Sequence, residues 1–266
     1  MIYKKSDFSF SVFQDSRGQS GMSGQLQLAK YKDGMSYLVK TGDADIANEY
    51  VAHRLAKLIG VPTSDAVLIT DKKGLYGVGI VREPEFQRIS MDDFLGTEEN
   101  NRDEIPVFIG ERPYTPPKIT APKYPDDSPF LADAMRYIAF RHMIVLEDVV
   151  QLAVSQGRVI SFDYAESFCI LSTGFGIMLR TGKAETALGN FVNYLHLKNS
   201  YKNGIEILRR PDTVFLRAAH DEPFRRFLHV DREPILSDLD EVYPPVVANF
   251  YYNCFEYIQD KINELK

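Results

Sequence analysis

The sequence lacks the features that mark secreted and membrane-spanning proteins. It has only two cysteines, Cys169 and Cys254, which are far apart and form no CxxC pair, so neither a disulfide framework nor a zinc cluster is expected. No apolar run approaches the roughly 18 residues of a transmembrane helix. The first residues, MIYKKSDFSF, have no apolar stretch typical of a secretory signal. We therefore expect a soluble, cytoplasmic protein with no membrane partner.

An excess of positive charge is also missing. The chain has 31 Lys and Arg against 37 Asp and Glu, a net charge of −6. Proteins that bind nucleic acid through its phosphates usually carry the opposite sign, so direct nucleic-acid binding is not expected. The 266 residues, 44% hydrophobic and 26% charged, are typical of a globular protein with a hydrophobic core.

The hydrophobic pattern predicts a strand-rich first third. Alternating apolar residues indicate strands at 8–12 and around 26–28. A return strand at 37–40 follows the turn at Asp33-Gly34, and two more strands, at 66–70 and 75–81, are joined by the turn at 71–74. A helix is predicted from about residue 43 to 59, where Gly60 and Pro62 end it.

The remainder is predicted to be mainly helical. A proline-rich segment, 97–128, is expected to be an irregular insert. A helix follows from Phe130 toward Leu146, then two short strands at 152–154 and 158–162, and helices after Glu166 that end with an amphipathic one at 249–265. We predict an α+β fold with two lobes, a strand-rich N-lobe at 1–83 and a helical C-lobe at 84–266.

A glycine-rich turn between two predicted strands is the first candidate for chemistry. Glycine allows close backbone approach to a ligand, and successive N–H groups in such a turn can bind phosphate oxygens. A plain flexible hairpin is the alternative interpretation. The turn contains Ser20, Gly21, Ser23 and Gly24.

Four charged residues at the ends of predicted strands or on predicted helices are further candidates for a functional site. Lys40 ends an apolar strand, and Glu49 lies on the next helix, where it could hold the lysine in place; ordinary solvent-exposed side chains are the alternative. Asp148 follows a long helix, and Asp163 follows a β-branched strand. A carboxylate there is costly unless it binds a metal or caps a helix, and a helix starting near Glu166 is the competing explanation.

The order of these parts matches phosphoryl transfer in the protein-kinase architecture. The segments SGMSGQLQLAKYKDGMSYLVK and ANEYVAHRLAKLIGVPTSDAVLI resemble the N-terminal lobe of HipA-like kinases, bacterial relatives of the protein-kinase and phosphoinositide-kinase fold. IVLEDVVQLAV and VISFDYAESF resemble the aspartate loop and the later strand aspartate of that family. The resemblance is close over residues 18–82 and loose over 130–170, and it implies a bilobal protein-kinase-like fold.

The resemblance also implies roles and ligands. Lys40 would contact the phosphates of ATP, Glu49 would fix Lys40, Asp148 would orient or deprotonate the acceptor hydroxyl, and Asp163 would hold Mg²⁺. The implied activity is ATP- and Mg²⁺-dependent phosphorylation of a Ser or Thr hydroxyl of a protein. A small DNA-binding antitoxin is an implied partner. Backbone groups between the lobes would bind adenine, and they belong to Ile80, Val81, Arg82 and Glu83.

The sequence departs from the family pattern at one position. The family loop D-R-H-x-x-N has an asparagine that supplies a metal ligand, and here Ala153 takes its place. Gln151 carries an amide two residues earlier and is the alternative metal ligand if the loop is rebuilt. The second functional hypothesis is therefore a pseudokinase, a nucleotide- or protein-binding scaffold without phosphoryl transfer. The five histidines, His53 among them, show no ligand spacing and are expected to be ordinary core or surface residues.

Overall fold

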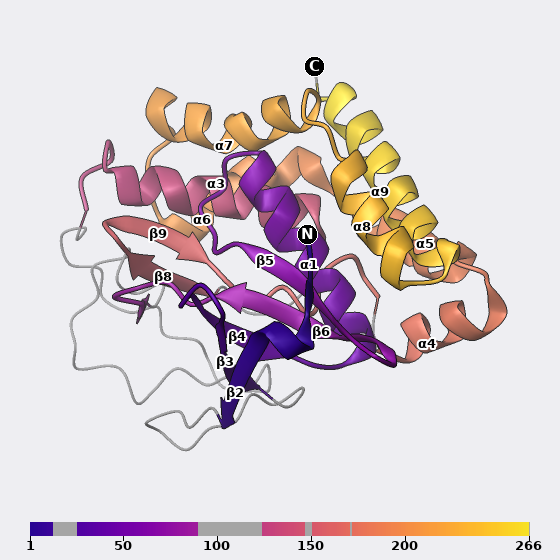
Figure 1. The fold of residues 1–266 in the computed structure, drawn as a ribbon. Coiled ribbons are helices and arrows are strands. Elements are labelled where there is room, and N and C mark those ends of the chain that lie inside the picture. Colours follow the sequence, from indigo (N-terminus) through magenta and orange to yellow (C-terminus); the bar gives the residue numbers. More distant parts are fainter. Residues whose placement is uncertain (13–25, 90–123, 147–150, 171, 266) are drawn as a thin grey trace, which may run out of the picture.

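The computed structural model describes residues 1–12, 26–89, 124–146, 151–170 and 172–265 (Figure 1). The N-terminal part forms a six-stranded sheet in the order β1-β5-β6-β4-β3-β2. β1 runs parallel to β5, and the other pairs are antiparallel. The strands are β1 (Ile2–Lys4), β2 (Phe8–Val12), β3 (Gln27–Tyr31), β4 (Ser36–Lys40), β5 (Ala66–Asp71) and β6 (Gly74–Val81).

Each face of this sheet has its own apolar cluster because successive side chains of a strand point to opposite faces. In β5, Val67 and Ile69 pack into a small cluster with Tyr37, whereas Ala66 and Leu68 join the large core. Helix α1 (Asp43–Leu58) packs on that second face, against β5 and β6. The helix ends where Gly60 adopts a positive φ of 80°, a conformation that favours glycine.

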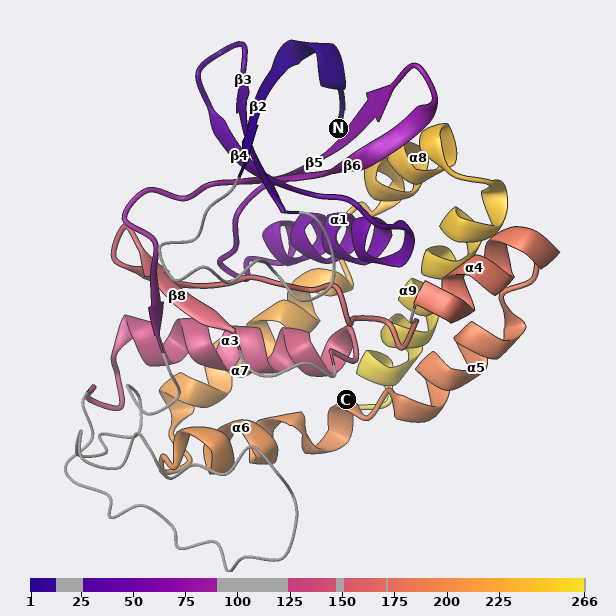
Figure 2. The same ribbon diagram turned by 90° about the horizontal axis from the view of Figure 1, so that it is seen from below.

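The C-terminal part is mainly helical. A small sheet of β7 (Gln87–Ile89), β8 (Leu152–Ser155) and β9 (Arg158–Ser161) lies beside α3, which packs on α6 and α7. Figure 2 shows the order of layers, with the six-stranded sheet above α1 and the helices α3, α7 and α6 below it. The helices are α3 (Pro129–Met143), α4 (Ser172–Thr181), α5 (Glu185–Tyr194), α6 (Ser200–Leu208), α7 (Val214–Phe227), α8 (Glu233–Val242) and α9 (Pro245–Asn263).

The two parts are joined by one continuous core. The large apolar cluster includes residues of α1, β5 and β6 together with residues of α3, α7, α8 and α9. A parallel bridge between Thr63 and Ser161 also crosses the junction, and the Ser161 N–H donates to Pro62 O at 3.1 Å. The fold is α+β and bilobal, as the sequence predicts. The division at residue 83 stays a prediction.

The structure contains two strands that the sequence does not predict, and it contradicts one interpretation of Asp163. The strands β1 and β7 are missing from the sequence prediction because each has three residues and is defined by pairing with distant strands. No helix begins near Glu166, because residues 164–170 form turns and α4 begins at Ser172. The explanation of Asp163 as a helix cap is therefore wrong. Most of the proline-rich segment, 97–123, lies outside the described residues.

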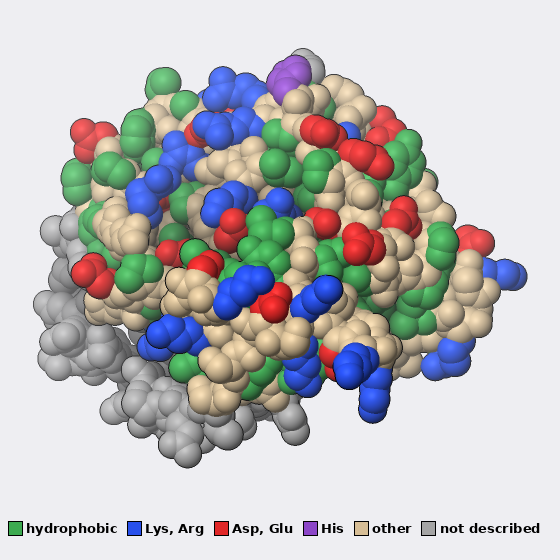
Figure 3. Space-filling model, viewed as in Figure 1, with side chains coloured by type: hydrophobic (Ala, Val, Ile, Leu, Met, Phe, Trp, Pro, Cys, Tyr) green, Lys and Arg blue, Asp and Glu red, His purple; other side chains and the backbone are tan. Residues whose placement is uncertain are grey.

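The outer surface carries both signs of charge, and Lys and Arg side chains gather over α7 (Figure 3). Exposed arginines of that helix include Arg217, Arg225 and Arg226. Among the described residues, no helix combines the length and apolar character needed to cross a bilayer.

A close backbone contact at Gly77 yields a stability prediction. A Cβ at Gly77 of β6 would lie 2.5 Å from the carbonyl oxygen of Lys40 in β4, too near for the backbone to accept it. We expect Gly77→Ala to lower the free energy of unfolding by about 1–3 kcal/mol. Gly189→Ala is the matched control, because a Cβ there meets open space and alanine favours its helix, α5. Urea unfolding of both variants checks this, and equal midpoints would contradict it.

A pH effect is expected from His142, at the end of α3. Burial, and then the charges of Arg141 and His220, lower the pKa of His142 from 6.5 to about 4. The unfolded chain therefore binds a proton below pH 6.5 that the folded protein does not bind until about pH 4. Stability is full above pH 6.5 and falls between pH 6.5 and 4, by about 3 kcal/mol in total.

The measurement is the free energy of unfolding at pH 7, 6 and 5 for the parent and His142→Gln. We expect the variant to lose less stability on acidification. Part of the loss will remain, because burial also lowers the pKa of His220. His229→Gln, at an exposed position, should keep the parental pH dependence, and a parental slope in His142→Gln would contradict the assignment.

Candidate functional site

Lys40, Glu49 and Asp163 meet at the junction of the two lobes. Lys40 is the last residue of β4, and its Nζ donates to Glu49 Oε1 of α1 and to Asp163 Oδ1, the latter at 2.6 Å. Asp163 lies 123 residues further along the chain than Lys40. Three residues that the sequence analysis selected separately therefore form one charged cluster.

Burial and charge compete in this cluster. Burial alone would lower the pKa of Lys40, but the carboxylates of Glu49 and Asp163 outweigh it and raise that pKa. Burial would raise the pKa of Glu49, whose side chain is 0% exposed, but Lys40 and His53 hold it well below its usual range. The pKa of Asp163 is raised by burial, which Lys40 only partly offsets. Lys40 and Glu49 therefore form a charged pair in the interior.

The β8–β9 hairpin positions Asp163. Leu152 of β8 pairs with Ser161 of β9, so Gln151, just before β8, lies opposite the residues after β9. Gln151 Nε2 donates to Asp163 Oδ2 at 3.1 Å, and Asp163 has a φ of 64°, unusual for a residue other than glycine. Ala153 is a fully buried strand residue.

Two residues at this site carry oxygen atoms of the type that binds magnesium. Mg²⁺ prefers oxygen ligands and is usually bound by one or two carboxylates together with the phosphates of a substrate. Asp163 supplies a carboxylate. Gln151 supplies an amide oxygen, and the nitrogen of the same amide donates to Asp163. No group of three or more His, Cys, Asp and Glu side chains suited to a metal occurs within the described part of the chain. Binding of Mg²⁺ by Asp163 and Gln151 stays a prediction.

Asn48 is a second connection from α1 to the segment after Asp163. Its Nδ2 donates to Ala165 O at 2.6 Å, and its Oδ1 accepts a 2.8 Å hydrogen bond from the Tyr251 hydroxyl of α9. The side chain is fully buried. In the sequence, Asn48 is recognisable only as part of the helix motif ANEYVAHRLAKLIG, with no indication of these contacts.

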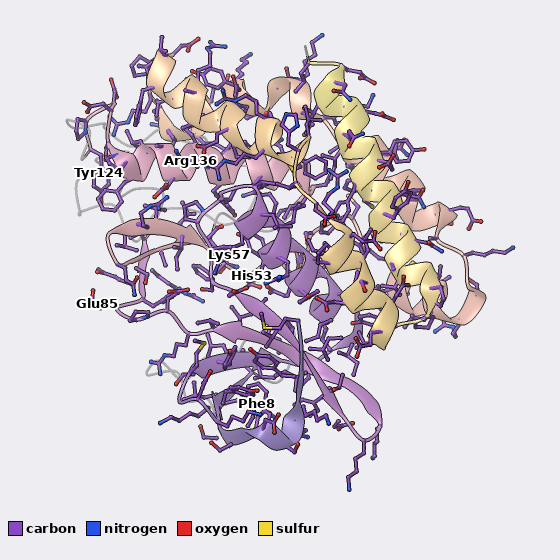
Figure 4. All side chains as sticks on the ribbon, turned by 45° about the horizontal axis from the view of Figure 1, so that its top comes forward. Phe8, His53, Lys57, Glu85, Tyr124 and Arg136 are labelled. Atoms are coloured by element: carbon purple, nitrogen blue, oxygen red, sulfur yellow. The ribbon has the colours of Figure 1, made fainter. Side chains whose placement is uncertain are left out.

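His53 is the residue of this cluster that sequence reasoning missed. It lies one helical turn after Glu49, and its Nε2 is 3.2 Å from Glu49 Oε2. The spacing of four residues on a predicted helix was a usable signal, because such residues are neighbours on one face. Figure 4 shows His53 on α1, on the side toward the strands.

Other predicted site residues are placed differently or lie outside the described residues. The Val81 N–H donates to Asp65 O at 2.8 Å and the Arg82 N–H to Ser36 O at 2.9 Å, so the protein itself uses these donors. Ile80 is a buried strand residue, and Glu83 follows the end of β6. Adenine binding by this segment stays a prediction. The residues outside the described part are Ser20, Gly21, Ser23, Gly24 and Asp148.

A solved structure has a similar fold. The chain superposes on the proinflammatory kinase CtkA of Helicobacter pylori with a TM-score of 0.57, covering 94% of this chain and 93% of that one. The fold is kinase-like. Sequence identity is 13%, so the likeness is one of fold alone. The sequence matches no known protein family and no curated protein, and membership of the HipA-like family stays a proposal.

Proposed function

We propose that the protein is an ATP- and Mg²⁺-dependent phosphotransferase of the HipA-like type. The observation that carries this proposal is the contact of Lys40 with both Glu49 and Asp163. A Lys–Glu ion pair with an aspartate of the other lobe beside it matches the parts that phosphoryl transfer in a kinase-like fold uses. The kinase-like fold supports the same conclusion.

The roles follow from charge and position. Lys40 binds phosphate oxygens, and Glu49 fixes its ammonium group. Asp163 and Gln151 hold Mg²⁺, which when bound neutralises charge on the phosphates. The turn with Ser20, Gly21, Ser23 and Gly24 is proposed to cover the phosphates, and Ile80, Val81, Arg82 and Glu83 to border the adenine. Most of the acceleration in such a site comes from positioning and electrostatic stabilisation.

The acceptor rests on the family resemblance. We propose a Ser or Thr hydroxyl of a protein, with Asp148 orienting or deprotonating it. A small antitoxin-type protein is the proposed partner on the same ground.

A scaffold without phosphoryl transfer is the second candidate. It is favoured by Ala153, which has no ligand atom where the family has asparagine, and by the engagement of both Asp163 oxygens by Lys40 and Gln151. In that case nucleotide or protein binding would be the function of the fold.

The test is to incubate the purified chain with ATP and Mg²⁺ or Mn²⁺, and to measure intact mass and thermal stability. Gain of one phosphoryl group, for example on Ser20 or Ser23, or transfer to an added protein supports the enzyme. A thermal shift with ATP and no transfer supports the scaffold. If neither transfer nor a thermal shift occurs, the enzyme and the nucleotide-binding scaffold are both contradicted, and only the protein-binding scaffold is left. Samples without metal and samples with AMP serve as controls.

A further inference from the structure

Asn48 is a fully buried polar residue of α1 whose side chain contacts two other parts of the chain. Its Nδ2 donates to Ala165 O at 2.6 Å and to Ile170 O at 3.4 Å, and its Oδ1 accepts from the Tyr251 hydroxyl of α9 at 2.8 Å. A main-chain carbonyl can only accept a hydrogen bond, so the amide nitrogen must face the two carbonyls and the amide oxygen the hydroxyl. The contacts therefore allow one orientation of the amide.

Both carbonyls belong to residues 164–170, a segment of turns that directly follows Asp163. Positive φ angles occur at Asp163 (64°) and, within the segment, at Phe168 (61°) and Cys169 (52°). Residues other than glycine adopt this conformation at a cost in free energy, and they keep it where the surrounding structure holds them. The hydrogen bonds from Asn48 reach the segment near its start and at its end, so they hold it across these strained residues.

Phe168 holds the middle of the segment. Its N–H donates to Ile144 O, just after α3, at 2.7 Å. Its ring packs edge-to-face on the Tyr251 ring, with centroids 5.1 Å apart. Tyr251 thus contacts the segment through its ring and Asn48 through its hydroxyl. Removal of the hydroxyl alone leaves the ring contact in place and takes away only the hydrogen bond to Asn48.

Asn48 is the neighbour in sequence of Glu49, which contacts Lys40 at the candidate site. Helix α1 is therefore connected to the chain around Asp163 twice. Lys40 joins Glu49 to Asp163 through one ammonium group. Asn48 donates to Ala165, two residues after Asp163. Because these connections start from adjacent residues of one helix, a shift of the segment away from α1 also moves Asp163 relative to Lys40.

We propose that Asn48 is a positioning residue, which holds the segment 164–170 against α1 and so fixes Asp163 relative to Lys40. The Tyr251 hydroxyl completes the arrangement, because it is the donor that the amide oxygen faces. The consequence for phosphoryl transfer rests on the proposed function, whereas the holding of the segment does not.

Two variants test this proposal. Tyr251→Phe removes one hydroxyl and leaves a buried amide oxygen without its donor. Asn48→Asp has nearly the same shape but sets a carboxylate oxygen against the two carbonyls, so it removes the hydrogen bonds to the segment. Tyr252→Phe is the matched control, because it removes the same group from the next residue of α9, which is 50% exposed.

The first measurement is hydrogen exchange of the full chain, followed by mass spectrometry of peptides from 164–170 and from β5 and β6. We expect Tyr251→Phe to raise exchange in 164–170 by at least about fivefold, the effect of one hydrogen bond lost from a buried site, and Asn48→Asp to raise it further. In Tyr251→Phe, exchange in β5 and β6 should stay within about twofold of the parent. An equal rise in all of these peptides, or no rise in 164–170, would overturn the proposal.

The second measurement separates positioning from binding. In Tyr251→Phe we expect kcat for phosphoryl transfer to fall about 10-fold and KM for ATP to change less than about threefold, because only the placement of Asp163 is altered. Tyr252→Phe should stay within about twofold of the parent in both constants. A purely structural role would lower the fraction of folded protein, which circular dichroism measures, and leave kcat per folded molecule unchanged.

The two proposals fail differently. An inactive parent whose Tyr251→Phe variant shows the local rise in exchange removes the proposed function and keeps the holding role of Asn48. An active parent with a parental kcat in Tyr251→Phe, despite the local rise, removes the positioning of Asp163. If Asn48→Asp does not fold, Tyr251→Phe and its control decide both questions.

Discussion

Asp163→Asn is expected to lower the rate of phosphoryl transfer by about 10³-fold, the loss seen when one group that stabilises transition-state charge is removed. The amide has the shape of the carboxylate but not its charge, so it binds Mg²⁺ weakly and no longer pairs with Lys40. In the structure Asp163 is the carboxylate that contacts both Lys40 and Gln151. The measurement is kcat/KM for ATP at saturating acceptor.

Two other aspartates provide comparisons. Asp148→Ala should abolish turnover while leaving nucleotide binding largely intact, because its proposed role concerns the acceptor hydroxyl. Asp240→Asn, at an exposed position on α8, should change neither. If Asp163→Asn transferred phosphate at the parental rate, Asp163 would have no role in metal binding, and another site for the metal would be required.

Lys40→Met is expected to lower the free energy of unfolding by about 3–5 kcal/mol, the cost of removing one partner from a buried ion pair. Methionine fills a similar volume but leaves Glu49, with a side chain that is 0% exposed, next to Asp163 without the ammonium between them. Two carboxylates close together in the interior repel each other, so one must take up a proton or the segment must move. Guanidinium unfolding followed by circular dichroism gives the value.

The double variant Lys40→Met/Glu49→Gln separates charge from packing. It removes both members of the pair, and we expect it to be more stable than Lys40→Met alone, with a coupling energy of about 0.5–3 kcal/mol. Lys30→Met, on an exposed position of β3, is the control and should change stability by no more than about 0.5 kcal/mol. A loss in Lys40→Met as small as that in Lys30→Met would mean that Glu49 reaches solvent or another cation.

The sequence alone predicts much of the fold because local pattern and tertiary structure agree there. The apolar segments of β5 and β6, and the glycine and proline after α1, identify those elements correctly. β1 and β7 could not be predicted, since each is three residues long and exists through pairing with a strand far along the chain. Their strand conformation comes from tertiary contact and not from their own side chains.

The candidate site is predictable in part for the same reason. Lys40 and Glu49 are nine residues apart, at the end of a strand and within the next helix, so their contact follows from local structure. The contact of Gln151 with Asp163 depends on the register of the β8–β9 hairpin, in which Leu152 pairs with Ser161. Sequence spacing places Gln151 two residues too early, and only the hairpin shows that its amide reaches Asp163.

The hydrogen bond from Tyr251 to Asn48 has a consequence for how the protein is made. The two residues are 203 positions apart, and a ribosome synthesises the chain from the N-terminus at a limited rate. Asn48 is therefore completed long before α9 exists, and the nascent chain holds this amide without its later partner. The surroundings of Asp163 reach their final arrangement only after α9 has been translated, so a nascent chain does not have the assembled site during most of its synthesis.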